Sequence, residues 1–88
     1  MQKNLTHKAV VWSKYNCAAC TTVKQLLKHH GYTVEERNIE DHPWTKQQLL
    51  EAVPNVRSVP QVFINDNYVG GLDNVRNYFD RIKKTTLG

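Results

Sequence analysis

The sequence contains no apolar stretch that could cross a membrane. Its longest uninterrupted apolar runs have four residues, such as Ala9–Trp12, whereas a membrane-spanning helix needs about 20. The first residues, Met1–Thr6, also lack the apolar segment of a secretory signal peptide. We therefore expect a cytoplasmic protein with no membrane-bound part.

Dense runs of basic residues are also missing, although the formal net charge at pH 7 is +4. The 12 lysines and arginines are scattered along the chain and are not interleaved with aromatic side chains. This distribution is typical of solvated surface and not of a nucleic-acid-binding face. We expect no nucleic-acid partner, although a mildly positive field favours acidic ligands.

Cysteine is scarce, and its two occurrences are Cys17 and Cys20. In a cytoplasmic protein such a close pair is more often catalytic or metal-binding than structural. The four histidines, at positions 7, 29, 30 and 42, do not follow the pair at the spacing of zinc ligands. We therefore expect no resident metal ion.

No linker rich in glycine, proline or serine divides the 88 residues. A chain of this length has room for one hydrophobic core. We expect a single domain over residues 1–88, with flexible ends at 1–8 and 85–88.

Apolar spacing predicts alternating strands and helices. Strands are predicted where apolar, β-branched and aromatic residues gather, at 9–13, 32–39, 61–64 and 68–69. Helices are predicted at 18–30, from Pro43 to about 53, and at 72–84. The resulting order, β-α-β-α-β-β-α, predicts an α/β fold with one four-stranded mixed sheet flanked by helices.

Each predicted helix has an apolar face that should pack against the sheet. The residues of these faces are Val23, Leu26 and Leu27 in the first helix, Leu49, Leu50 and Val53 in the second, and Leu72, Val75, Phe79 and Ile82 in the last. Asp73 stands where an N-cap would begin the last helix.

The cysteine pair lies where the first strand gives way to the first helix. Free backbone N–H groups at a helix start favour an anion, so we expect the pKa of reduced Cys17 to lie below the free value of about 8.5. Cys20 follows one turn later on the same face, within reach of a disulfide. This arrangement predicts a dithiol redox centre.

Three motifs in this order resemble the glutaredoxin family of the thioredoxin fold. They are the segments 14–20 (Lys-Tyr-Asn-Cys-Ala-Ala-Cys), 57–64 (Arg-Ser-Val-Pro-Gln-Val-Phe-Ile) and 70–74 (Gly-Gly-Leu-Asp-Asn). The resemblance spans residues 9–82. It implies a monomeric, glutathione-linked oxidoreductase that reduces protein disulfides and glutathione mixed disulfides through Cys17 and Cys20. Ribonucleotide reductase is a frequent client in the family.

The resemblance also implies where glutathione or a substrate binds. Pro60 should be cis and face the dithiol, and the backbone of Val59 should pair with the extended ligand. Lys14 and Arg57 match positions that contact the glycyl carboxylate of glutathione. A polar contact from Gln47 or Gln48 is a weaker candidate.

At the other end of the ligand, the resemblance implies contacts from Gly71, Asp73 and Asn74. Glycine lets the backbone approach closely, and N–H groups at the helix start should hold the γ-glutamyl carboxylate. The family usually has aspartate where this chain has Asn74. The contact to the ligand's amino group therefore weakens or passes to Asp73.

The chain departs from the family between the two cysteines, where Ala18 and Ala19 replace the common Pro-Tyr pair. Two alternatives to the glutathione-linked enzyme follow from such departures within the family. One is a glutaredoxin-like reductant recharged by thioredoxin reductase. The other is a dimer that holds a 2Fe–2S cluster, ligated on each side by Cys17 and glutathione.

Overall fold

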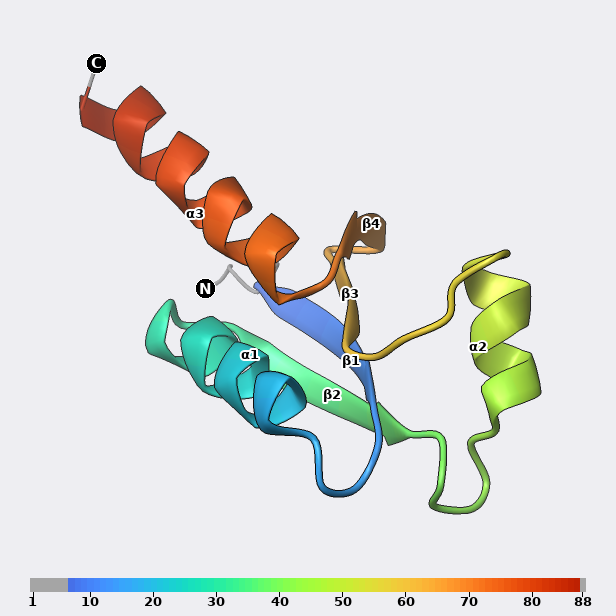
Figure 1. Cartoon of the computed structure of the whole chain (residues 1–88). Coiled ribbons are helices and arrows are strands. Elements are labelled where there is room, and N and C mark those ends of the chain that lie inside the picture. The colour runs from blue at the N-terminus through green and yellow to red at the C-terminus, as the bar shows by residue number, and fades with distance from the viewer. Residues whose placement is uncertain (1–6, 88) are drawn as a thin grey trace.

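The computed structural model describes the backbone of residues 7–87 and the side chains of residues 7–82. Four strands and three helices follow one another in the order that the sequence predicts (Figure 1). They are β1 (Lys8–Ser13), α1 (Ala18–His29), β2 (Thr33–Asn38), α2 (Lys46–Ala52), β3 (Gln61–Ile64), β4 (Asn67–Gly70) and α3 (Leu72–Leu87).

The strands form one mixed sheet in the order β2-β1-β3-β4. Strand β1 runs parallel to β2 and antiparallel to β3, and β3 pairs with β4 as an antiparallel hairpin. The hairpin turns at Asn65 and Asp66, whose φ angles are 49° and 70°. Two successive residues with positive φ make a type I′ turn, which matches the twist of the flanking strands.

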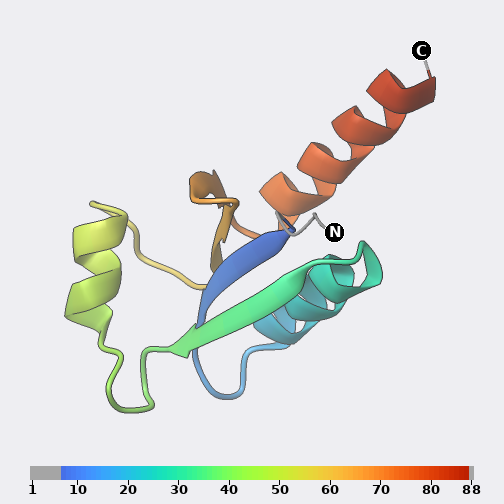
Figure 2. The same cartoon turned by 180° about the vertical axis from the view of Figure 1, so that it is seen from behind.

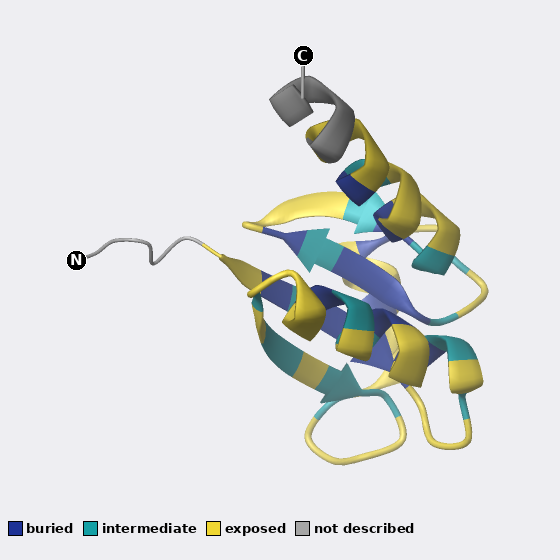
Figure 3. Cartoon of the chain, turned by 90° about the vertical axis from the view of Figure 1, so that its left-hand side faces the viewer, coloured by how far each residue is buried: buried dark blue, intermediate teal, exposed yellow. Residues whose placement is uncertain are grey.

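Helices cover both faces of the sheet. Helices α1 and α3 lie side by side on one face, while α2 stands apart on the other (Figures 1 and 2). The larger core lies under α1 and α3 and consists of Ala9, Val11, Val23, Leu27, Val62, Ile64, Val75 and Phe79. A smaller core under α2 consists of Trp12, Leu49 and Val53. Figure 3 shows the buried residues as a stripe through the strands and the inner sides of α1 and α3.

Helix α1 begins and ends at residues that suit its two termini. Cys17 is the N-cap, with extended backbone at φ −122° and ψ 102°. Gly31 follows the C-cap with a φ of 85°, a left-handed conformation that glycine adopts without a steric penalty. The predicted end of this helix at Gly31 is confirmed.

Helix α2 begins later than the sequence analysis predicts. Pro43 lies in the turn before the helix, after a cis peptide bond, and Thr45 is the N-cap. Thr45 and Gln48 form a capping box, in which each side chain bonds the other residue's backbone N–H. Leu49 is buried, but Leu50 is 37% exposed, so its predicted place in the core is wrong.

The ends of the described chain also differ from the expected ones. Lys8, expected in a flexible end, pairs with Thr33 as the first residue of β1. Helix α3 continues to Leu87, and Ile82 is 42% exposed because this part of the helix projects beyond the sheet (Figure 1). Neither α3 nor any other helix in the described part is long and apolar enough to cross a membrane.

Replacing Leu27 with alanine is expected to lower the free energy of unfolding by about 2–5 kcal/mol, because the side chain is fully buried between α1 and the sheet. Leu50→Ala on the exposed side of α2 is the matched control, with an expected loss below about 1 kcal/mol. Urea denaturation of the oxidised protein measures both. Equal losses in the two variants would contradict this core.

Candidate active site

The two cysteines form a disulfide at the start of α1. Their Cα atoms lie 5.2 Å apart, and the backbone N–H of Cys20 donates a hydrogen bond to Cys17 Sγ at 3.1 Å. Cys17 is half-buried, whereas Cys20 is 1% exposed. An incoming molecule therefore reaches the sulfur of Cys17 and not that of Cys20.

A cleft of about 440 Å³ opens beside Cys17. Cys17, Thr21 and Lys24 line it from one face of α1, because residues four and three positions apart share a helix face. The hydroxyl of Thr21 donates to the carbonyl oxygen of Cys17 at 3.3 Å. Lys14 lines the cleft from the loop between β1 and α1. Two cations thus lie on the side of the cleft that carries the thiol.

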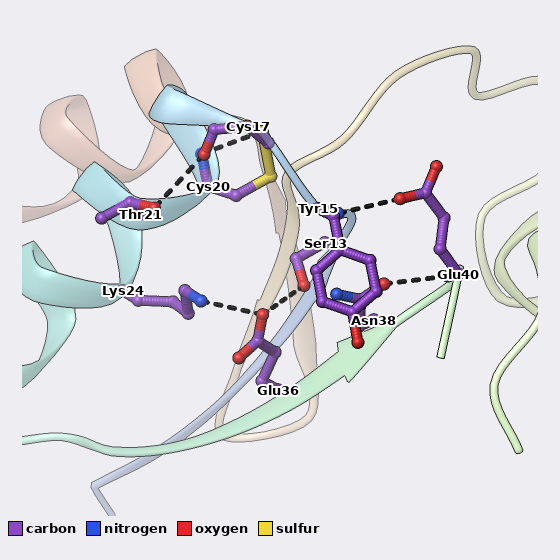
Figure 4. A network of polar contacts seen from close by, with 9 residues as sticks. All are labelled: Ser13, Tyr15, Cys17, Cys20, Thr21, Lys24, Glu36, Asn38 and Glu40. Carbon is purple, nitrogen blue, oxygen red and sulfur yellow. Dashed lines mark hydrogen bonds and ion pairs between the residues drawn. A yellow bond between two sulfur atoms is a disulfide. The ribbon is translucent and has the colours of Figure 1, made fainter. Parts of the chain in front are cut away.

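Glu36 of β2 holds Lys24 in place at this cleft. Its Oε2 accepts hydrogen bonds from Lys24 Nζ at 2.8 Å and from the hydroxyl of buried Ser13 at 2.6 Å (Figure 4). These two bonds, that of Lys24 foremost, hold the pKa of Glu36 below its usual value. The carboxylate therefore stays charged and fixes the ammonium group of Lys24.

Replacing Glu36 with glutamine is expected to lower the free energy of unfolding by about 1 kcal/mol at neutral pH, a modest loss because the carboxylate is partly exposed. Since the pKa of Glu36 is lowered by folding, its stabilisation is complete above the unfolded pKa of about 4.3. It is lost as the pH falls through the lower pKa of the folded state.

Urea denaturation of the oxidised protein at a series of pH values tests this prediction. The difference between wild type and Glu36→Gln should shrink below about pH 4. Glu51→Gln, at an exposed site on α2, is the matched control and should change stability by less than about 0.5 kcal/mol throughout. A difference that persists undiminished in acid would contradict the role given to the charge.

Acidic residues of the β2–α2 connection hold the loop that precedes Cys17. The backbone N–H of Tyr15 donates to Glu40 Oε1 at 3.0 Å, and the N–H of Glu40 donates to Asn38 Oδ1 at 2.9 Å (Figure 4). A hydrogen bond with Asp41 raises the pKa of Tyr15, whose side chain lines the cleft. The loop is thereby tied to the end of β2.

Trp44 borders the cleft from the same connection. It packs edge-to-face on Trp12, with ring centroids 5.7 Å apart. The guanidinium of Arg37 lies over both rings, at 5.2 Å from Trp12 and 4.5 Å from Trp44. These cation–π contacts fix the aromatic wall of the cleft.

The Val59–Pro60 peptide bond is cis, as the resemblance implies. Pro60 is buried, and Val59 is half-buried. Within the described part of the chain, no hydrogen bond uses the backbone N–H or carbonyl of Val59. These two groups are the kind that an extended ligand can pair with. Lys14, Arg57 and Val59 together line a second hollow, of about 240 Å³.

The start of α3 is built differently from the expected one. Gly71, not Asp73, is the N-cap: its carbonyl accepts the N–H of Val75, and its N–H donates to Asn74 Oδ1 at 3.0 Å. The predicted N-cap role of Asp73 is therefore wrong. The Asp73 side chain is 92% exposed, with Arg76 at 3.8 Å. A Cβ placed on Gly71 would lie 3.5 Å from the carbonyl oxygen of Pro60, so these two segments adjoin.

The structure thus groups the predicted site residues into three neighbourhoods. Lys14 and Cys17 share the first cleft, Lys14, Arg57 and Val59 share the second hollow, and Pro60, Gly71 and Asn74 adjoin at the start of α3. Most residues that line the first cleft were not predicted from the sequence, among them Tyr15, Thr21, Lys24 and Glu36. Helical spacing from Cys17 points to Thr21 and Lys24, and no local pattern points to Glu36.

This chain has few side chains of its own that could ligate an iron–sulfur cluster. Residues 7–82 contain no group of three or more histidine, cysteine or acidic side chains placed to hold a metal ion. Cys20 is buried, so Cys17 is the one thiol that the chain would offer to a shared cluster. The iron–sulfur alternative therefore stays a prediction that requires a second subunit and glutathione.

A four-stranded mixed sheet with helices on both faces and a Cys-x-x-Cys pair at the start of its first helix defines a thioredoxin-like dithiol protein. The glutaredoxin family model matches residues 9–69. The chain therefore belongs to the glutaredoxin family of thiol–disulfide oxidoreductases.

Individual relatives agree with this assignment. The chain is 35% identical over 78 residues to glutaredoxin-C4 of Arabidopsis thaliana, covering 85% of this chain and 57% of that protein. It is 39% identical over 70 residues to a glutaredoxin of Vernicia fordii, covering 77% of this chain and 67% of that protein. A buckwheat glutaredoxin–glutathione complex is similar in structure, with a TM-score of 0.73 and 29% identity, covering 85% of this chain and 70% of that one.

Proposed function

We propose that this chain is a dithiol glutaredoxin that uses glutathione to reduce disulfides in proteins and mixed disulfides of glutathione. The observation that carries the proposal is the unequal placement of two linked thiols: Cys17 accessible at a helix N-cap and Cys20 buried one turn later. Such a pair suits one attacking and one resolving thiol.

Reduction of a client begins with the thiolate of Cys17. It attacks one sulfur of the client disulfide, so that the client S–S bond breaks, a mixed disulfide forms and one client thiol is released after taking a proton. Cys20 then loses its proton and attacks the sulfur of Cys17. The second client thiol leaves, and two electrons have passed from the dithiol to the client.

Two molecules of glutathione restore the dithiol. The first attacks Cys17 and releases the thiol of Cys20, which leaves a mixed disulfide between Cys17 and glutathione. The second attacks the glutathione sulfur of that mixed disulfide, releasing the thiolate of Cys17 and glutathione disulfide. With a glutathionylated client, the thiolate of Cys17 attacks the glutathione sulfur, so that the client thiol leaves and the mixed disulfide between Cys17 and glutathione forms directly. One molecule of glutathione then resolves it as above, and Cys20 is not needed.

Free polar groups near the thiol support a place for glutathione. The unbonded backbone of Val59 suits the cysteinyl part of the tripeptide, and Lys14 and Arg57 suit its glycyl carboxylate. At the other end, Asn74 already uses its side-chain oxygen on Gly71. We therefore assign the ligand's amino group to the exposed carboxylate of Asp73.

Electron donors distinguish this proposal from its main alternative. Reduction of an insulin disulfide is measured with NADPH, glutathione and glutathione reductase, and in parallel with NADPH and thioredoxin reductase. The proposal predicts turnover with the glutathione system and at most background with thioredoxin reductase. Turnover with thioredoxin reductase alone would overturn it. A brown, dimeric protein after anaerobic purification would instead support cluster binding.

The setting of this activity is also part of the proposal. A dithiol that glutathione must keep reduced suits the cytoplasm, where thiols are held reduced. The clients are disulfide-containing proteins, of which ribonucleotide reductase is one candidate, and the chain would act on them as a monomer.

A further inference from the structure

The second hollow lies between α2 and the loop that carries the cis proline. Lys14 lines both this hollow and the cleft at Cys17, so the two adjoin at this residue. Its outer wall is α2, the helix that stands apart from the other two (Figures 1 and 2). A molecule held at the thiol can therefore extend into the hollow.

The charges at the hollow are mainly positive. Lys14, Lys46 and Arg57 line it, and none of the ion pairs found among the described residues involves any of them. Glu40 is the one acidic residue among the described lining residues, and its carboxylate accepts the backbone N–H of Tyr15. Three cations therefore face a ligand with little internal compensation, which favours a carboxylate.

Part of the lining of the hollow is apolar. Leu50, which is 37% exposed, lines it together with the half-buried side chains of Ile39, Val56 and Val59. Glutathione carries carboxylates, amides and one thiol, so it has no bulky apolar group to cover Leu50. The hollow therefore offers more apolar surface than glutathione uses, next to more cations than its one glycyl carboxylate needs.

We propose that this hollow binds the client protein itself: an extended segment beside the reacting cysteine, with one bulky apolar side chain and a neighbouring carboxylate. The apolar side chain covers Leu50 and Val56, and the carboxylate meets Lys46. The backbone of the same segment pairs with Val59 before the client leaves and glutathione takes that place, so side-chain recognition falls to the hollow. This inference rests on the proposed thiol–disulfide exchange and names the clients that it favours.

Two peptides, each closed by a disulfide between two of its own cysteines, and one small substrate test the inference. The first peptide carries Leu-Asp on both sides of each cysteine, the second carries Ser-Lys there, and the small substrate is the mixed disulfide of glutathione and mercaptoethanol. Wild type is expected to turn over the Leu-Asp peptide with a kcat/KM about tenfold above that of the Ser-Lys peptide.

Variants on α2 locate the preference. Leu50→Ser and Lys46→Glu are each expected to lower kcat/KM for the Leu-Asp peptide by about fivefold, with less than a twofold change for the small substrate. Lys28→Glu makes the same charge change at an exposed position of α1 that lines neither the cleft nor the second hollow. It should leave the peptide preference intact. Leu50→Gln replaces Leu50→Ser if serine destabilises α2.

Results other than these would contradict either the client preference or the proposed function, and the experiment distinguishes the two. Equal rates for the two peptides, with normal turnover of the small substrate, overturn the inference and leave the proposed function standing. No turnover of the small substrate by wild type overturns the proposed function. An equal loss on all three substrates in Lys46→Glu assigns the hollow to glutathione. A change of oligomeric state in the α2 variants, measured by light scattering, assigns it to a second copy of the chain.

Discussion

Replacing Cys17 with serine is expected to reduce every exchange activity of the protein to the rate measured without enzyme. The attacking species is a thiolate, and a serine hydroxyl at the same N-cap stays protonated near neutral pH. Cys20 cannot substitute, because its side chain is 1% exposed. The coupled assay with glutathione and glutathione reductase measures the loss on both a protein disulfide and a glutathionylated peptide.

The control for this variant is to show that it is folded. Serine is itself a favourable N-cap, so Cys17→Ser should fold, and its circular dichroism should match that of reduced wild type. Residual activity above background in a folded Cys17→Ser protein would contradict the assignment of Cys17 as the attacking thiol.

Replacing Cys20 with serine is expected to divide the two activities. Reduction of a protein disulfide should fall to background, because the variant lacks the second thiol, which in wild type forms the disulfide with Cys17, to resolve the mixed disulfide. Removal of glutathione from a glutathionylated peptide should continue, because free glutathione attacks that mixed disulfide directly. The variant should also trap an adduct on Cys17 that intact-mass measurement detects.

Two results would contradict this division of labour. One is full reduction of protein disulfides by the folded Cys20→Ser variant. The other is an adduct that peptide mapping places away from Cys17. Ser13→Ala, which removes the buried hydroxyl beside Glu36 and keeps both thiols, is the matched control and should trap no adduct.

Much of the fold follows from local sequence patterns. The periods of apolar residues separate the strands from the helices, and the buried Val23 and Leu27 of α1 keep their predicted positions. The turn at Asn65 and Asp66 follows from the ease with which these residue types adopt positive φ. The dithiol position is equally local, because it depends on one strand-to-helix junction.

Other features depend on contacts that no local pattern determines. Leu49 and Leu50 are adjacent, and only the orientation of α2 on the sheet decides which of them is buried. The bond from Ser13 to Glu36 requires the parallel register that pairs β1 with β2. Ile82 keeps helical spacing but lies beyond the sheet, so periodicity alone overstates its burial.

A different kind of limit applies at the helix starts. Thr45 and Gln48 form a capping box that the sequence carries, but Pro43 is an equally acceptable helix start by composition. At α3, Asp73 has the residue type of an N-cap, and Gly71 takes the position because Asn74 bonds back to it. Competing signals of similar strength are decided by the tertiary structure.

The most direct test of the account is the rate at which each thiol is alkylated. The fully reduced protein is treated with limiting iodoacetamide between about pH 5 and pH 9, and peptide mapping assigns the label. Cys17 is expected to be labelled first, with a rate midpoint below the free thiol value of about pH 8.5, while Cys20 is expected to react slowly because it is buried. Faster labelling of Cys20 at neutral pH, or a Cys17 midpoint at or above the free value, would contradict the account.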